Sequence, residues 1–366
     1  HKLPVFSYYT YYKVGSKFED PDTTGSSHLL EHMMFKGAKK YGEGEFDKMV
    51  EGNGGNNNAY TTNDLTVYYE NLPSQHFATI ADLEADRMQN LLLADDSFKK
   101  EVNVVLEERK MRYENSDRGK IYLEMMKNLF VGTPYGSSVI GEIKDLKSIT
   151  RKRVHDYFKT YYVPNNAVIV IVGDLKAEKV FEQINKSFGA IPANKNLDKI
   201  KADHLAKKGF EFQAELPKDV RLKGTSPLPM FSLAYKGIKI GPRDSFVLDI
   251  LSSIIGGGES SYLSKKFVVG ENPKLQGIYA ANYTLQESGV FFIGGAMLNG
   301  GNRAQFKGEL IREVRKSCRK AISKKAVQKS SSKKQSKKAG QKNSSKKQAK
   351  KAVQKSRPKK QFKKAV

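Results

Sequence analysis

The stretch GSSHLLEHMMFKG, residues 25–37, places two of the six histidines of the chain four positions apart in one short apolar segment. Gly25, Ser26 and Ser27 offer an N-cap ahead of HLLEHMMF, and helical spacing continues to about Phe35. Residues four apart on a helix share a face, so their side chains reach the same point in space. We therefore expect a helix with two imidazoles on one side and a glutamate beside the second.

His28 and His32 form an imidazole pair of the kind that suits zinc, and Glu31 projects next to their face. The order is H-x-x-E-H, the inverse of the commoner zinc-peptidase helix. A lone histidine on an apolar helix is usually a satisfied core residue. At ordinary residue frequencies, however, a chance H-x-x-E-H in a chain of this length arises on the order of once in a hundred sequences. Two imidazoles beside a carboxylate also make a poor core, so the pattern predicts a metal site.

A catalytic zinc site needs a third protein ligand and an open position for water. The later segment KKEVNVVLEERK offers it, because Glu101 and Glu108 lie seven residues apart, two turns along one helix face. Val104 and Val105 are expected between them on the same side. The competing interpretation is that this glutamate-rich helix lies at the surface and its glutamates are solvated. Spacing also leaves the choice between Glu107 and Glu108 open.

The remaining segments alternate between strand and helix patterns. Residues 5–14 alternate and are rich in aromatics, and NNNAYT with DLTVYYENL reads as a strand pair. Helical spacing recurs in GEFDKMVEGNGG, in SQHFATIADLEADRMQNLLL, in SFKKEVNVVLEERKMRYEN with Ser97 as its cap, and in IYLEMMKNLF. AVIVIVGDL, residues 167–175, is a continuous apolar run that predicts a buried strand. Residues 192–225 are predicted to be a linker with one strand at FEFQAEL.

The second half repeats this theme. FSLAYKGI predicts a strand, DSFVLDILSSII a helix that GGGE ends, and LQGIYAANYTL with SGVFFIGGAML two more strands before a helix from about Asn302. Two units of related order predict a duplicated α+β architecture. We expect a first lobe at 1–191, a linker at 192–225, a partial second lobe at 226–320 and a basic tail at 321–366.

The formal net charge of +25 belongs mainly to the tail. Residues 321–366 contain 18 Lys or Arg and no acidic residue, so subtracting 18 from 25 leaves +7 for residues 1–320. The tail has almost nothing to bury and is expected to be disordered. Such a segment would bind nucleic acid or another polyanion non-specifically and with steep salt dependence. With Phe362 as its only aromatic residue, it is not expected to stack on bases.

The length of 366 residues allows two or three domains. Cys318 is the only cysteine, which excludes an internal disulfide and leaves no cysteine pair for a structural zinc site. No run of eighteen apolar residues exists, so no membrane span is expected. The chain opens on a strand pattern without a signal peptide. Its natural N-terminus is therefore expected to be missing, and the compartment stays open between the bacterial periplasm and the cytoplasm.

These motifs resemble the pitrilysin/insulinase family of zinc metallopeptidases, the inverzincins, and in particular its bacterial members that are similar to the mitochondrial processing peptidase. HLLEH is followed by EVNVVLEE about seventy residues later, and the similarity continues through GGNNNAYTTNDLTVYY, PYGSSVIGEIKDLKSI and YYVPNNAVIVIVGDL. It covers nearly all of residues 1–320. The resemblance implies duplicated lobes of the pitrilysin/processing-peptidase type, of which the second lobe here is incomplete.

In that family the third metal ligand stands at the place of Glu108, which the resemblance thus favours over Glu107, with one Zn²⁺ per chain. The glutamate at the place of Glu101 orients a ligand histidine without touching the metal. The resemblance also implies that NNNAYT is an edge strand on which substrate lies, with Asn58 and Ala59 in contact with it. An extended peptide gains main-chain hydrogen bonds at such an edge, and Gly54, Gly55 and Ala59 would keep its approach uncrowded.

The implied activity is zinc-dependent hydrolysis of peptide bonds in short or unfolded polypeptides, with Glu31 as the general base that takes a proton from metal-activated water. Tyr279 matches a substrate-contacting tyrosine of the second lobe. The arginine that accompanies it in the family is unmatched, because the stretch SSYLSKKFVVGE offers Lys265 and Lys266 instead. A catalytically impaired, peptide-holding subunit is the alternative. The resemblance also implies assembly as a homodimer or with a family-type partner subunit.

Overall fold

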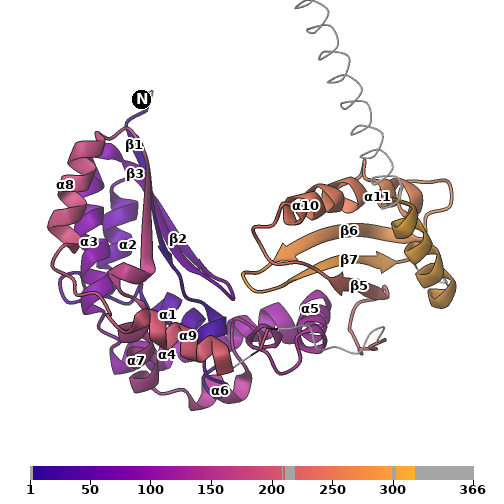
Figure 1. Cartoon of the computed structure of the whole chain (residues 1–366), viewed down its shortest axis with the longest axis horizontal. Coiled ribbons are helices and arrows are strands. Elements are labelled where there is room, and N and C mark those ends of the chain that lie inside the picture. The colour runs from indigo at the N-terminus through magenta and orange to yellow at the C-terminus, as the bar shows by residue number, and fades with distance from the viewer. Residues whose placement is uncertain (1–2, 208, 211–218, 299–301, 318–366) are drawn as a thin grey trace, which may run out of the picture.

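The chain folds into two lobes, each built on an antiparallel sheet with helices of its own lobe against one face (Figure 1). Mixed helices and sheets in two related lobes confirm the predicted duplicated α+β class. The predicted basic tail and Cys318 lie outside the described part of the chain. The computed structural model describes residues 3–207, 209–210, 219–298 and 302–317.

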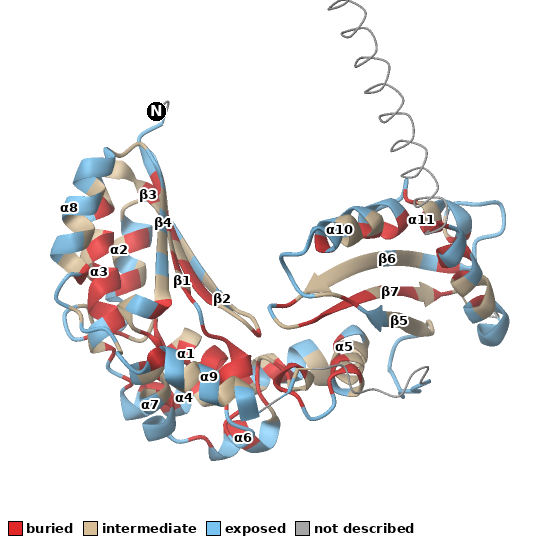
Figure 2. Cartoon of the chain, viewed as in Figure 1, coloured by how far each residue is buried: buried red, intermediate tan, exposed pale blue. Residues whose placement is uncertain are grey.

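The first lobe has a four-stranded antiparallel sheet in the order β2-β3-β1-β4. Every second side chain of β1 is buried, and these side chains pack against helices that cover one face of the sheet (Figure 2). The strands are β1 (Val5–Tyr12), β2 (Asn56–Thr61), β3 (Thr66–Pro73) and β4 (Ala167–Gly173). The helices are α1 (Ser26–Met33), α2 (Glu45–Gly52), α3 (Phe77–Asn90), α4 (Asp95–Arg109), α5 (Asp117–Leu129), α6 (Ile143–Ser148), α7 (Arg151–Tyr161), α8 (Ala177–Phe188) and α9 (Leu197–Lys207).

Strand β4 is not the buried strand that its apolar run predicts. It pairs with β1 alone and forms one edge of the sheet. Val168, Val170 and Val172 are 42%, 42% and 68% exposed, whereas Ile169 and Ile171 pack against the helices. A continuous apolar run indicates burial on both faces, but helices cover only one face of this sheet. The prediction of a buried strand is therefore wrong.

Helix α9 lies within the segment predicted to be a linker. Leu197 is buried in the core of the first lobe, and Ile200 and Leu205 pack against that core. The ammonium of Lys201 donates a hydrogen bond to the carbonyl oxygen of Lys13, at 2.8 Å. This part of the segment is thus structured on the first lobe. The strand expected at FEFQAEL falls almost wholly outside the described residues.

The second lobe repeats the order of elements of the first, with a strand, two helices, two strands and a helix at 303–317. Its sheet order β5-β7-β6 matches β1-β3-β2 of the first lobe. Ile255, Leu263, Phe267 and Ile293 are buried in its core. The elements are β5 (Met230–Lys236), α10 (Arg243–Gly256), α11 (Tyr262–Phe267), β6 (Leu275–Thr284) and β7 (Gly289–Met297).

Helix α5, the segment after β1 and the turn between β2 and β3 contact the second lobe. Met126 and Leu129 of α5 share an apolar cluster with Leu285 of the second lobe. The ammonium of Lys17, fully buried, lies 2.9 Å from the carboxylate of Asp64 and donates to the side chain of Gln286 at 2.6 Å. Within the described ranges, every helix is too short or too polar to cross a bilayer.

Candidate metal centre

The helix with the two histidines, α1, begins in a tight turn that only glycine suits. Gly25 is the N-cap with φ of +93°, and a Cβ there would lie 2.6 Å from the carbonyl oxygen of Ile140. The N-cap therefore lies within the predicted segment, at Gly25, but no serine side chain caps the helix. The buried carboxylate of Glu19 accepts hydrogen bonds from the backbone N–H groups of Gly25 and Ser27, at 2.8 and 2.7 Å. An anion at a helix N-terminus is favourable, so Glu19 anchors this end of α1.

Helix α1 packs on α4, and this contact determines which side chains meet. Leu29, Leu30 and Met33 of α1 are fully buried in the core. On α4, Val105 is fully buried, whereas Val104 is 48% exposed. The expectation that both valines share the buried side is therefore wrong for Val104.

The start of α4 also differs from its prediction. The helix begins at Asp95 with Ala94 as N-cap, so Ser97 lies inside its first turn. The Ser97 hydroxyl donates instead to the carboxylate of Glu43, at 2.6 Å. The cap predicted at Ser97 is wrong, because acidic residues already begin the helix two positions earlier.

One ligand atom each from His28, His32 and Glu108 lies within 4.8 Å of the other two. The Nε2 atoms of His28 and His32 are 3.5 and 3.3 Å from the same oxygen, Oε2 of Glu108. The centroids of the two imidazole rings are 4.8 Å apart. Tetrahedral zinc with bonds of about 2.0–2.2 Å separates its ligand atoms by roughly 3.3–3.6 Å. The two distances to Glu108 match that spacing.

The chemistry of the donor atoms also fits a cation. Oε2 of Glu108 is buried and has no hydrogen-bond partner among the described residues. A buried carboxylate oxygen without a donor is costly unless a cation satisfies it. Two imidazole nitrogens and a carboxylate oxygen are a donor set that zinc accepts. Glu107 is 70% exposed and lies 3.5 Å from Lys110, so the structure brings Glu108 and not Glu107 to the histidines.

Charged neighbours hold two members of this group in place. Oε2 of Glu101, a residue only 7% exposed, lies 3.1 Å from Nδ1 of His32, and its other oxygen lies 2.8 Å from the ammonium of Lys36. Arg112 lies 2.7 Å from Oε1 of Glu108. Sequence reasoning missed Lys36 and Arg112. Each stands four residues after a member of the group, and this helical spacing is the signal that could have found them.

The pKa values in the group follow from burial and from these neighbours. Burial, followed by the charge of His32, lowers the pKa of His28 to about 4. Burial also opposes protonation of His32, but the adjacent carboxylates of Glu108 and Glu101 outweigh it and raise the pKa of His32. Burial disfavours ionised Glu108, yet the adjacent His32, His28 and Arg112 hold its pKa below the usual value. At neutral pH, His28 is therefore a neutral imidazole and Glu108 a carboxylate.

Glu31 lies between the two histidines in α1 and is held by the neighbouring strand. The Thr61 hydroxyl, at the end of β2, donates a hydrogen bond to Oε2 of Glu31. Burial raises the pKa of Glu31, and this hydrogen bond offsets only part of that effect. Sequence reasoning did not identify Thr61, because nothing in the local pattern shows that β2 ends against α1.

Strand β2 forms the edge of its sheet opposite β4, as predicted. Asn58 is exposed and its side-chain oxygen accepts from the N–H of Ala59, which is half-buried. Gly54, with φ of +74°, has open space where a Cβ would lie. A Cβ at Gly55 would instead lie 2.5 Å from the side chain of Leu72, so this glycine serves packing against β3. The expectation that both glycines keep an outside approach open is wrong for Gly55.

The second lobe does not bring its predicted residues to the group. The Tyr279 ring contacts Phe292 at 6.1 Å and lies over Gly294, where a Cβ would be 2.4 Å from the tyrosine hydroxyl. Lys265 and Lys266 are exposed on α11. In the part of the chain that the structure describes, no hydrogen bond or ring contact joins these three residues to the metal-centre residues, namely His28, Glu31, His32 and Glu108.

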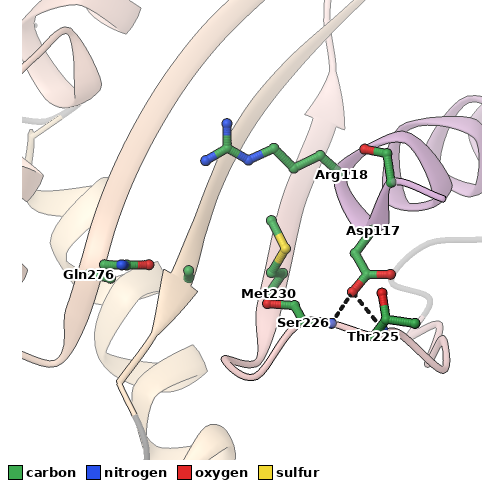
Figure 3. A pocket seen from close by; sticks show the side chains of 8 residues that line it. Asp117, Arg118, Thr225, Ser226, Met230 and Gln276 are labelled. Carbon is green, nitrogen blue, oxygen red and sulfur yellow. Dashed lines mark hydrogen bonds between the residues drawn. The ribbon is translucent and has the colours of Figure 1, made fainter. Parts of the chain in front are cut away.

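A cavity of about 330 Å³ lies between α5 and the second sheet (Figure 3). Asp117, at the start of α5, accepts hydrogen bonds there from the backbone N–H groups of Thr225 and Ser226, at 2.8 and 2.6 Å. Arg118 and Gln276 also line the cavity. None of the predicted site residues lines it, so the candidate metal centre lies elsewhere, between α1 and α4.

The fold and the residues that it brings together define a class: a two-lobed α+β protein of the zinc-peptidase type, with H-x-x-E-H on one helix and a glutamate on another. The chain belongs to the insulinase or pitrilysin family. A profile described as "Insulinase (Peptidase family M16)" matches residues 9–142. A second profile, described as "Peptidase M16 inactive domain", matches residues 148–333.

Individual relatives agree with this membership. The chain is 34% identical over 300 residues to the zinc protease PqqE of Helicobacter pylori, covering 82% of this chain and 66% of that protein. It is 28% identical over 286 residues to a probable mitochondrial-processing peptidase subunit beta of Arabidopsis thaliana, covering 76% of this chain and 52% of the relative. The chain thus spans between about half and two thirds of the length of these two relatives.

A solved structure supports the same conclusion. The crystal structure of a protease from Helicobacter pylori aligns with a TM-score of 0.75 and 30% sequence identity. The alignment covers 85% of this chain and 74% of that one. Homologues named as zinc proteases therefore support a metallopeptidase family for this chain.

Proposed function

We propose that the chain is a zinc-dependent endopeptidase that hydrolyses peptide bonds in short or unfolded polypeptides. His28, His32 and Glu108 would hold one zinc ion. The observation that carries this proposal is the convergence of two imidazole nitrogens on one buried carboxylate oxygen, at 3.5 and 3.3 Å, from two separate helices. The names of the relatives, all zinc proteases or processing-peptidase subunits, point to the same chemistry.

When bound, zinc would lower the pKa of a coordinated water and polarise the scissile carbonyl group. Glu31 acts as the general base, accepting a proton from the attacking water and donating it to the leaving amine. Burial raises the pKa of Glu31 toward neutral pH, and a pKa nearer the operating pH suits a group that first accepts and then donates a proton. Thr61 holds one oxygen of this carboxylate and so leaves the other for the proton. Glu101 orients His32 through Nδ1 and thereby directs Nε2 toward Glu108.

The free edge of β2 is the proposed place for the substrate. A peptide that adds as a strand there gains main-chain hydrogen bonds that do not depend on its sequence. Asn58 and Ala59 would contact it, three and two residues before Thr61, which holds the general base. Such pairing needs an extended chain, so it favours short or unfolded polypeptides over folded proteins. This catalytic role belongs to the first lobe, 1–191, and the partial second lobe, 226–320, would cover the bound peptide.

A catalytically impaired, peptide-holding subunit is the second candidate. It is favoured by one observation, the separation of Tyr279, Lys265 and Lys266 from the metal-centre residues among the described parts of the chain. One of the relatives is named as a processing-peptidase subunit, which agrees with action beside a partner chain. In this case the metal would bind normally and peptides would be retained without cleavage.

Cleavage of a quenched peptide library by the zinc-loaded full chain separates the two candidates. The proposal predicts cleavage that a strong chelator abolishes and that added zinc restores. Cleavage that persists in chelator would contradict the zinc mechanism. Peptide binding with one equivalent of zinc and no cleavage would identify the peptide-holding subunit.

A further inference from the structure

The sheet of the first lobe leaves one face uncovered by helices, and we call it the open face. The strand register places its side chains in rows that cross all four strands. Figure 1 shows α2, α3 and α8 on the other side of this sheet and the second lobe on the side of the open face. The first row is Tyr60, Val67, Tyr11 and Val168; the second is Asn58, Tyr69, Tyr9 and Val170; the third is Asn56, Asn71, Ser7 and Val172.

No side chain in these three rows is charged, although 28% of the residues in the chain are Asp, Glu, Lys or Arg. The Tyr9 ring stacks on Tyr69 at 5.1 Å and on Tyr11 at 5.9 Å. Tyr60 is 43% exposed and Val168 and Val170 are 42% exposed each, whereas Val67 in the first row is fully buried. Solvent-facing sheet surfaces are usually polar, so an uncharged aromatic surface of this kind indicates a binding role.

The composition of the open face changes along the strands. All four tyrosines lie in the first two rows, whereas the third row is mostly small and polar. The first row contains Tyr60, which directly precedes Thr61, the residue that holds Glu31. The aromatic part of the face is thus the part beside the proposed reacting centre.

We propose that the two aromatic rows bind the substrate polypeptide through uncharged aromatic and aliphatic side chains and disfavour charged ones. This inference rests on the proposed function, because it names the substrate class of the same site. A peptide paired with the free edge of β2 directs alternate side chains to the side on which Asn58 and Tyr60 point. These side chains, and chain that extends beyond the edge, reach the open face.

The chemistry of the rows determines the preference. Tyrosine rings supply rigid apolar area with a hydroxyl group at the rim, a combination that is common where proteins bind polypeptides. A charged substrate side chain would lose water there without meeting an opposite charge, which is unfavourable. Apolar side chains gain from burial against the rings and the valines.

Peptide binding to the zinc-loaded Glu31→Gln full chain tests the inference without turnover. The chain contains no tryptophan, so a single tryptophan in the peptide reports binding through its own fluorescence. One ten-residue peptide carries Leu and Tyr at alternate positions, and its partner carries Lys and Glu there. We expect the uncharged peptide to bind at least about tenfold more tightly.

Two lysine substitutions make this test specific to the open face. Val170→Lys places a charge in the second row at an edge position that is already 42% exposed. Phe181→Lys is the control, because Phe181 is 68% exposed on α8, which packs on the covered side of the sheet. We expect Val170→Lys to weaken binding of the uncharged peptide about five- to tenfold and Phe181→Lys to leave it unchanged. Circular dichroism checks that both variants remain folded.

Equal affinity for the two peptides, or equal effects of the two substitutions, would overturn the inference. Loss of a dimer in Val170→Lys with unchanged peptide affinity would also overturn it, because the face would then pair with a second copy. Selective peptide binding by a chain that never cleaves peptides would retain the inference and overturn the proposed hydrolase. Peptide cleavage by wild type, together with equal binding of the two peptides, would retain the proposed hydrolase and overturn the inference.

Discussion

Replacing Glu101 with glutamine should weaken zinc binding about ten- to a hundredfold, or about 1.4–2.7 kcal/mol. Glu101 is 7% exposed, lies 3.1 Å from Nδ1 of His32 and pairs at 2.8 Å with Lys36. Glutamine keeps the shape and one oxygen that accepts from His32, but it removes the negative charge that raises the basicity of this imidazole. The loss of zinc affinity should therefore be about tenfold for Glu101→Gln and about a hundredfold for Glu101→Leu.

Competition between the protein and a chromophoric chelator at neutral pH measures this difference. Glu107→Gln is the matched control, because Glu107 lies on the same helix but is 70% exposed and pairs only weakly, with Lys110 at 3.5 Å. Its affinity should equal that of wild type. Equal zinc affinities of wild type, Glu101→Gln and Glu107→Gln would refute the role of Glu101. Equal losses of affinity in Glu101→Gln and Glu107→Gln would show a general effect of charge.

Three further outcomes are expected. Glu31→Gln should retain zinc at the wild-type level while turnover falls about 10²- to 10⁴-fold, as measured by metal analysis and peptide cleavage; unchanged turnover would remove Glu31 from the mechanism. Zinc affinity should rise as the pH rises through the raised pKa of His32, because metal and proton compete for it, whereas His28, with a pKa of about 4, stays neutral; titrations from about pH 5 to 8 that show no slope would contradict this. Leu30→Ala should lower the free energy of unfolding by about 2–5 kcal/mol in urea, because Leu30 is fully buried behind the histidines, and a loss under about 1 kcal/mol would show that the core there can collapse.

Local patterns in the sequence predict the parts of the site that lie within one helix. His28, Glu31 and His32 occupy consecutive turns of α1, so their relation follows from helical periodicity alone. The third member required a tertiary contact. Glu107 and Glu108 are adjacent in sequence, and only the packing of α4 on α1 turns Glu108 inward and leaves Glu107 in solvent.

Features that depend on layers and edges could not be predicted from periodicity. The run in β4 is apolar on both faces, but whether a helix covers each face depends on elements far away in the chain. Thr61 reaches Glu31 because β2 ends against α1, and a hydroxyl at a strand end carries no local signal of this contact. Glu19 acts as the cap of α1 from six residues upstream of Gly25, where the sequence suggested the nearer serines.

Anomalous diffraction at the zinc absorption edge, from crystals of the zinc-loaded chain, tests the central claim most directly. The account predicts one strong peak within about 2.0–2.2 Å of Nε2 of His28, Nε2 of His32 and an oxygen of Glu108. A peak that lies elsewhere, or one that both imidazoles approach while Glu108 stays beyond bonding distance, would contradict it.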